Sequence, residues 1–494
     1  MKIAKSLLLG STAGLVAVSG AQAADLPVKA KPVQYVKICS LYGEGFYYIP
    51  GSDVCLKIGG YVQADYGWNR AGSGQQHYTG ANGAQDRSVS PYSSRHRAHF
   101  NFDSRTQTAY GTLRTFVTVH IENREQNTVT VSPARAFIQW AGFTFGHTKS
   151  YTDVPGTPGA DSFRSLHQNQ NISDTGANGT NQIAYTWDLG SGMTLSVGAD
   201  ERRTKGIGNL SLNVVTVGAQ PNSTFGPYQH PTPWVNFVVN QAWGRFGVSA
   251  IFNKVNATYY TDTPGVLGYV PGAGCVSQPG TTFCGHPDDK WGWAVLSGID
   301  IKAPWAGPGD HFGGYFDYGV GAAAYSGGAN LGSAGLFGGG NTVAVGVISD
   351  GVFVNGGQFE LTTVWSTGAG WEHFWLANVS TAVYGNYTQI RYNDTVINDR
   401  LFCNGGGGQN FNVSGQCDPG FNFWTVGAVT NWYPVAGFRL AVDVLYTRIE
   451  TAFDGQTVTL SKAQGLRPTG LYTAKDQGIL SVVFRAQRSF ASGD

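Results

Sequence analysis

The sequence predicts an all-β fold, a transmembrane antiparallel β-barrel of 16 strands with short periplasmic turns and long extracellular loops. Two observations favour this fold. Stretches of roughly ten residues alternate between apolar and polar side chains with a period of two, and the breaks between them alternate between short turns and long loops. The composition agrees, because 70 of the 494 residues are Gly, 13% are aromatic and only 13% are charged. A formal net charge of +1 favours neither nucleic acid nor anionic lipid as a partner.

Residues 1–23 are predicted to be a cleaved, Sec-type signal peptide. Lys2 and Lys5 precede an apolar stretch at 7–18, and Ala21 and Ala23 supply the small residues of a cleavage site. An N-terminal anchor is the alternative, but the stretch is short and is interrupted by Gly and Ser. We therefore expect a periplasmic or extension segment at 24–53, a barrel pore domain at 54–490 and a short tail at 491–494. No later segment has the ~18 consecutive apolar residues of a spanning helix, so a membrane-embedded chain must form a closed barrel.

The six cysteines indicate an oxidising compartment. They fall into three pairs that are close in sequence: Cys39 with Cys55, Cys275 with Cys284, and Cys403 with Cys417. Six cysteines allow fifteen pairings, and the short separations favour these three as disulfides that staple loops. A zinc site is the alternative, but it would need closely spaced Cys and His clusters.

Three stretches show the alternation most clearly, at residues 55–68, 94–103 and 110–122. Weaker examples lie at 134–140, 182–187, 194–203, 358–365, 438–448 and 478–490, and less regular ones bring the count to about sixteen. Short turns are expected at 104–108, 305–310 and 435–437. An even strand count with short turns at one end and long loops at the other is typical of outer-membrane barrels.

The polar faces of these strands distinguish a membrane barrel from a soluble sandwich. Arginines recur in phase with other polar residues: Arg95, Arg97, Arg114, Arg135, Arg202, Arg439 and Arg485. The packed core of a sandwich could not hold so many guanidinium groups, whereas a hydrated lumen can. Aromatic residues such as Trp140, Trp187 and Trp424 lie near strand ends, where interfacial girdles are found, although sandwich edges also carry aromatic residues.

Several segments, at both ends of the chain, carry a resemblance to a known family. They are YGEGFYYIPG at 42–51, CLKIGGYV at 55–62, YGTLRTFV at 110–117, AFIQWAGF at 136–143 and FRAQRSF at 484–490. These segments resemble the alphaproteobacterial general porins, the major outer-membrane pores of rhizobia and Brucella relatives. The resemblance implies a homotrimer in the outer membrane, inserted by the barrel-assembly machinery, that passes small hydrophilic solutes and ions by passive diffusion. The family usually ends on an aromatic residue, whereas here Phe490 is followed by four more residues.

The resemblance also places the pore constriction. In general porins the third loop folds into the lumen, and here that loop runs from about 151 to 181. It carries Asp153, Asp161 and Asp174, which we expect to face a basic wall formed by the inward arginines. That wall consists of Arg95, Arg97, Arg114 and Arg135. Opposed charges would create a transverse field that orients dipolar solutes and sets ion preference, but loop carboxylates are also commonly plain surface charges.

The sequence predicts no enzyme, no catalytic residue, no cofactor and no metal site. The segment 146–150 lacks the adjacent Gly and Lys of a phosphate-binding loop. His96 and His99 are three residues apart on a predicted strand and point to opposite faces. Two alternatives remain open: a substrate-selective channel of the same fold, and a secreted all-β adhesin or hydrolase that would be soluble without detergent.

Overall fold

The structure, a computed structural model, describes residues 37–72, 74–125, 128–167, 175–176, 179–211, 225–259, 285–328, 331–403, 413, 415–460 and 463–490. The chain divides into two units, residues 1–55 and 56–494. The described part of the first unit contains η1 (Ser40–Tyr42) and β1 (Tyr47–Tyr48). Its small core consists of Phe46 packed on the disulfide between Cys39 and Cys55, with Tyr42 and Tyr48 at its edge. A disulfide of this kind stabilises a segment too short to build a larger core.

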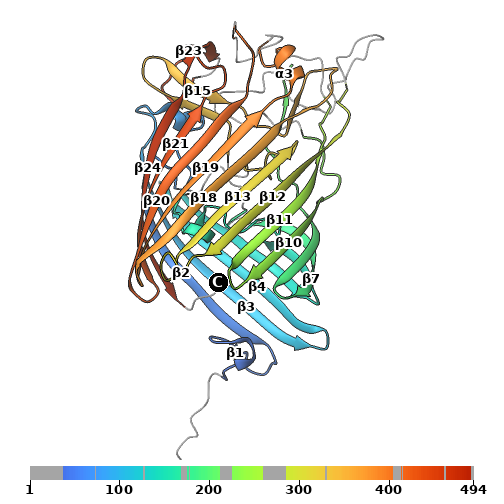
Figure 1. Ribbon diagram of the computed structural model, residues 1–494, viewed down its shortest axis with the longest axis vertical. Coiled ribbons are helices and arrows are strands. Elements are labelled where there is room, and N and C mark those ends of the chain that lie inside the picture. The colour runs from blue at the N-terminus through green and yellow to red at the C-terminus, as the bar shows by residue number, and fades with distance from the viewer. Residues whose placement is uncertain are drawn as a thin grey trace, which may run out of the picture. The chain divides into compact units, whose positions relative to one another are not determined.

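The second unit is a closed antiparallel barrel of sixteen strands within the described residues (Figure 1). Each strand pairs with the next one along the chain, and the last pairs with the first. The strands are β2 (Cys55–Trp68), β3 (Tyr92–Thr108), β4 (Gly111–Arg124), β5 (Thr128–Trp140), β6 (Phe143–Thr148), β7 (Thr180–Gly190), β8 (Met193–Asp200), β10 (Thr232–Gln241), β11 (Gly244–Val255), β12 (Lys290–Lys302), β13 (His311–Val320), β18 (Thr363–Leu376), β19 (Val379–Arg391), β20 (Phe421–Val435), β21 (Phe438–Glu450) and β24 (Gln477–Phe490). The predicted fold class is confirmed.

The period-two alternation sorts side chains between the outside and the interior of the barrel. On β2, Val62 is 53% exposed, whereas its neighbour Gln63 and the next inward residue Asp65 are buried. The same pattern on the other strands gives an apolar outer face and a polar inner face, as a barrel in lipid requires. Aromatic rings contact one another near strand ends at tilted angles, as in the pairs Trp365 with Tyr387 and Trp424 with Tyr446.

Some predicted boundaries were wrong. Residues 104–108 continue β3, and the turn lies at 109–110, because Thr108 still pairs with Gly111. The predicted strand at 194–203 ends at Asp200. Most of the predicted strand at 358–365 lies in a loop, and only its last residues begin β18. The alternation alone does not report where hydrogen bonding to the neighbouring strand begins or ends.

The long loops are themselves folded. They contain a four-stranded sheet of β14 (Ala334–Phe337), β15 (Thr342–Gly346), β22 (Thr457–Leu460) and β23 (Gly470–Ala474), and a three-stranded sheet of β9 (Ile207–Asn209), β16 (Gly351–Phe353) and β17 (Glu360–Leu361). In the described part of the loops, the short helices are η2 (Gly80–Ala84), α2 (Ala160–Phe163) and α3 (Asp394–Asn398). No helix in the described part of the chain has the length and apolar character needed to cross a membrane. A disulfide joins Cys403 and Cys417, whereas Cys275 and Cys284 lie outside the described residues.

At the short-turn end, the buried carboxylate of Asp310 ties the 303–310 turn to β18. It accepts hydrogen bonds from the backbone N–H of Phe374 (2.9 Å), from His373 Nδ1 (2.8 Å) and from Trp371 Nε1 (3.3 Å). We expect Asp310→Ala to destabilise the barrel by roughly 1–3 kcal/mol, because it leaves three partly buried donors without their acceptor. The measurement is the midpoint of thermal unfolding in detergent, monitored by the difference in gel mobility between the folded and the unfolded barrel. The exposed Asp454→Ala is the control, and equal midpoints for the two variants would contradict the assignment.

Candidate functional site

The loop between β6 and β7, which we call loop L3, is described at residues 149–167, 175–176 and 179, and its described part crosses the interior of the barrel. Its first part lies against the wall formed by β8 to β13. Ser150 Oγ donates to Asp200 (2.8 Å), and Ser249 Oγ donates to the Thr152 carbonyl (3.1 Å). Further along, Gly156 sits so close to β12 that a Cβ there would lie 1.8 Å from the Ile299 carbonyl oxygen. Glycine is therefore required where the loop backbone meets the wall.

The tip of loop L3 packs on β13 and β18. The ring of Phe163 stacks on His311 with centroids 5.2 Å apart and planes 4° from parallel. Arg164 forms an ion pair with Glu372 at 2.8 Å. Glu372 also accepts a hydrogen bond from Ser380 (2.6 Å), so one buried carboxylate joins the loop to β18 and β19.

The strongest anchor of the tip is Asp443 on β21. Its carboxylate accepts hydrogen bonds from the backbone N–H of Leu166 (2.7 Å) and of His167 (3.3 Å), and from Ser165 Oγ (3.0 Å). Tyr384 of β19 donates to its other oxygen (2.7 Å). Hydrogen bonds to an ionised acceptor are roughly twice as strong as neutral ones. Loop L3 is thus fixed across the interior, from its origin at β6 to β21.

Three of the four predicted basic residues, Arg95, Arg97 and Arg114, lie on the wall formed by β24, β2, β3 and β4, each paired with a carboxylate. Asp65 on β2 accepts from Arg95 on one side (2.6 Å) and from Arg485 on the other (2.6 Å). All three side chains are buried. Since two guanidinium groups share one carboxylate, the cluster keeps an excess positive charge.

The same arrangement occurs twice more along this wall. Glu122 pairs with Arg97 at 2.7 Å and with Arg124. Asp103 pairs with Arg105 (2.7 Å) and with Arg114 (3.0 Å). Together these contacts place six guanidinium groups around three carboxylates, an excess of three positive charges; the members are Arg95, Arg97, Arg105, Arg114, Arg124, Arg485, Asp65, Asp103 and Glu122. We call this set the arginine ladder.

The four predicted arginines do not form one ring. Arg114 lies opposite Arg105, ten residues along β3 from Arg95, which is about 33 Å at ~3.3 Å per residue. Arg135 on β5 is not part of the ladder and donates to the carbonyl of Gly176 in loop L3 (2.5 Å). The arginines therefore line the length of one wall, and Arg135 contacts the returning part of the loop.

The predicted acidic residues of loop L3 are only partly described. Asp153 accepts from the backbone N–H (3.0 Å) and the hydroxyl (2.6 Å) of Thr175, which ties the two halves of the loop together. Asp161 lies in α2, but only its backbone is described, and Asp174 lies outside the described residues.

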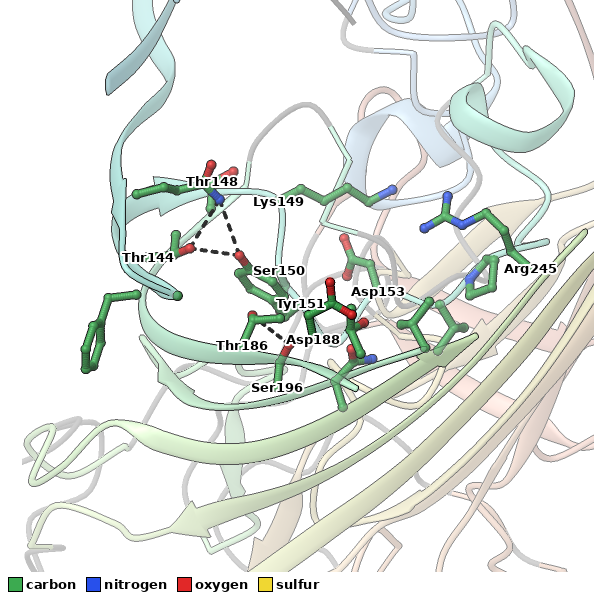
Figure 2. Close-up of a pocket in the computed structure, with 18 of the residues that line it drawn as sticks. Thr144, Thr148, Lys149, Ser150, Tyr151, Asp153, Thr186, Asp188, Ser196 and Arg245 are labelled. Carbon is green, nitrogen blue, oxygen red and sulfur yellow. Dashed lines mark hydrogen bonds between the residues drawn. The ribbon is translucent and has the colours of Figure 1, made fainter. Parts of the chain in front are cut away.

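On the short-turn side of loop L3 lies a cavity of about 1100 Å³. It is lined by the loop and by β5 to β8 and β10 to β12. Lys149 and Arg245 extend toward one another over a space that Asp153 and Asp188 also line (Figure 2). Charges of both signs therefore face this cavity.

Glu372 and Asp443 were missed in the sequence, although both lie at inward positions of strands. Asp443 falls on the polar phase of a stretch that was predicted as a strand, which is the signal that could have identified it. Glu372 lies beyond the point where the alternation around Trp365 becomes irregular. Among the described residues, no group of three His, Cys, Asp or Glu side chains could hold a metal ion.

A closed antiparallel barrel with an apolar outer face, a charged interior and a loop folded through that interior defines an outer-membrane channel. The family model described as "Porin subfamily" matches residues 25–483, and the chain belongs to that family. The resemblance to alphaproteobacterial porins is confirmed, and the protein is located in the outer membrane.

Curated relatives carry matching names. Porin Omp2b of Brucella canis is 34% identical over 322 residues, which cover 60% of this chain and 81% of the relative. Porin Omp2b of Brucella suis is 27% identical over 313 residues, covering 60% and 80%. A putative outer membrane protein of Sinorhizobium fredii, y4fJ, is 30% identical over 223 residues, covering 43% and 60%.

Among solved structures, the outer membrane channel DcaP of Acinetobacter baumannii superposes with a TM-score of 0.55. The match covers 90% of this chain and 99% of DcaP at 15% sequence identity, which shows a shared fold.

Proposed function

We propose that this porin forms a passive, water-filled channel for small hydrophilic solutes and ions. Its constriction lies between loop L3 and the arginine ladder, with Arg95, Arg97, Arg114 and Arg135 on the basic side. The observation that carries the proposal is the course of loop L3 through the interior, with its first part on the wall of β8 to β13 and its tip held by Asp443 on β21, next to β24 of the ladder wall. No chemical step is required, because solutes move down their own gradients.

The charge distribution supports a preference for anions. The ladder has three more guanidinium groups than carboxylates, whereas Glu372 and Asp443 lie on the side where loop L3 docks. Fixed charges that line a pore bias the ions that enter it. Asp153 contributes to the acidic side, and we assign Asp161 and Asp174 the same role.

Planar-bilayer conductance under a salt gradient tests the proposal. We expect ohmic openings whose reversal potential indicates an excess of anion current at low salt. A purified, folded protein that gives no openings would contradict the channel mechanism, and a strongly cation-biased potential would contradict the role of the ladder.

A second candidate function is a channel selective for one class of solute. It is favoured by the cavity below loop L3, which presents Lys149 and Arg245 together with Asp153 and Asp188. Paired charges of opposite sign suit zwitterionic solutes. Saturable block of the current by an amino acid, absent with neutral sugars, would support this candidate.

We further propose a homotrimer in the membrane. β5 extends beyond β6, because β6 pairs only with residues from Ala136 to Trp140. Among the described residues, the earlier part of β5 thus has β4 on one side and no strand on the other, with Val129 and Val131 exposed. Such an edge is suited to contact with another copy.

We also keep the proposed division of the chain. It consists of a signal peptide at 1–23, an extension at 24–53, a pore domain at 54–490 and a tail at 491–494. We propose that the barrel-assembly machinery inserts the pore domain into the membrane.

A further inference from the structure

The long loops at one end of the barrel share a single apolar core. We call the described residues of the loops 69–91, 201–231, 321–362, 392–420 and 451–476 the mouth cap. β15, β23 and α3 mark this end of the barrel (Figure 1). Loops that only framed the entrance would be polar and solvated, whereas here they bury a core of more than twenty residues.

The core reaches into the barrel itself. Six inward residues of the wall belong to it: Val364, Ile390, Phe421, Phe423, Ile449 and Ile479. They come from β18, β19, β20, β21 and β24 and are almost fully buried. Inward positions of a hydrated lumen are normally polar, so the apolar residues show that this part of the mouth is filled by protein.

Loop 321–362 forms the centre of the mouth cap. Its segment 331–354 carries buried apolar residues, among them Val343, Val345, Val347 and Ile348. β15 pairs with β23, and β16 pairs with β9, so this loop joins two other loops by backbone hydrogen bonds. Tyr78 from loop 69–91 packs on Phe423 with ring centroids 5.0 Å apart.

A buried carboxylate also joins loops within the mouth cap. Asp350 accepts hydrogen bonds from Thr204 Oγ1 (2.7 Å), from the backbone N–H of Lys205 (3.0 Å) and from that of Ala323 (2.8 Å). Burial raises the pKa of Asp350 to about 6 despite these hydrogen bonds. The mouth cap is therefore a packed and hydrogen-bonded unit, comparable to the core of a small domain.

The mouth cap covers the entrance except on one side. Besides the core on β18 to β24, Tyr325 of the cap packs with the inward residues Trp234 of β10 and Ile251 of β11. Among the described residues, the apolar clusters of the cap take no inward side chain from β3 to β6. On that side, near the loop ends of β3 and β4, lie Arg97, Glu122 and Arg124 of the arginine ladder. A solute that enters from the long-loop end is thus directed along the arginine-bearing strands.

We infer that the mouth cap is a second size filter, separate from loop L3, which restricts entry from the long-loop end to a passage beside the arginine ladder. The channel is therefore asymmetric. Solutes of intermediate size reach the cavity below loop L3 from the short-turn end but are excluded at the long-loop end.

One-sided addition of graded polyethylene glycols to single channels in a bilayer tests this inference. A polymer that enters the pore lowers its conductance, so each side yields its own exclusion size. The orientation of each channel is found from biotin attached to the cysteine of Asp454→Cys, which lies at the long-loop end. The side on which added streptavidin changes the current is the long-loop side. The exclusion size is the size of the smallest polymer that fails to enter the pore. In the wild-type channel we expect a smaller exclusion size for polymers added on the long-loop side than for polymers added on the short-turn side. Equal exclusion sizes would overturn the inference.

A variant of the mouth cap locates the filter. Ile348→Asp places a charge in the buried core of the cap, which disfavours its packing. We expect the long-loop exclusion size to rise toward that of the other side, while the short-turn value stays constant. The matched control is Asn341→Asp, which adds the same charge at the exposed turn between β14 and β15. If folded Ile348→Asp channels keep the wild-type difference between the two exclusion sizes, the inference is overturned. If the variant does not fold, the comparison of the two sides of the wild-type channel decides.

The test separates this filter from the constriction at loop L3. Release of loop L3 alters conductance and leaves the difference between the two sides in place. Loss of the mouth cap removes that difference.

Discussion

Replacing Asp443 with alanine is expected to release the tip of loop L3 and to produce the largest change in conductance of any single substitution considered. The carboxylate holds two backbone N–H groups and the Ser165 hydroxyl of the loop, and it is fully buried. Loss of a buried ionised acceptor weakens such a docked contact by roughly 3–5 kcal/mol. This shifts the ratio of docked to undocked loop by about two to three and a half powers of ten, at about 1.4 kcal/mol for each.

Single-channel recording measures the effect. We expect a higher and noisier open current for Asp443→Ala, and an intermediate current for Asp443→Asn, which keeps one amide oxygen as an acceptor. Thr447→Val is the matched control, because Thr447 is an equally buried inward residue of β21 four positions further along. A quiet, wild-type current in folded Asp443→Ala channels would show that the loop is held elsewhere.

The second large effect is expected from the triple variant Arg95→Gln, Arg97→Gln and Arg114→Gln. Each affected carboxylate keeps one partner: Asp65 keeps Arg485, Glu122 keeps Arg124, and Asp103 keeps Arg105. No carboxylate is left buried without a counter-ion, so the barrel should still fold. The excess of three positive charges on the ladder disappears, and the reversal potential should move toward cation preference.

Ionic strength provides an internal check on the triple variant. Charges act over about 10 Å at 0.1 M salt and about 3 Å at 1 M, so the shift should be large at low salt and small at high salt. The matched control carries Lys at the same three positions and retains the charge. Identical reversal potentials for wild type and the Gln variant at 0.1 M would remove the arginine ladder from the selectivity mechanism.

Much of the barrel could be predicted because its signal is local. β2 was predicted with its observed bounds, since the face on which a strand residue lies depends only on its position in the alternation. The inward arginines were identified for the same reason. The boundaries at 104–108 and 358–365 were wrong because strand ends depend on the neighbouring strand, which the alternation does not report.

The counter-ions could not be predicted. Asp65 and Arg485 are 420 residues apart, and they meet only because β24 closes the barrel on β2. The same applies to Asp443, which receives the tip of loop L3 from 277 residues away. A carboxylate at an inward position can be identified from the sequence, but its partner cannot.

The sequence by itself determined the class of the protein, because export, strand alternation and the charge of the inward faces are all encoded within short stretches. Only the tertiary structure decided how the interior is divided. Closure of the barrel gives Asp65 its second arginine, Arg485. The folded barrel also anchors loop L3 on Asp443 and brings the apolar segment 331–354 onto Phe421 and Ile449. These contacts join residues far apart in the chain, and their energies come from burial and from paired charges that exist only in the closed barrel.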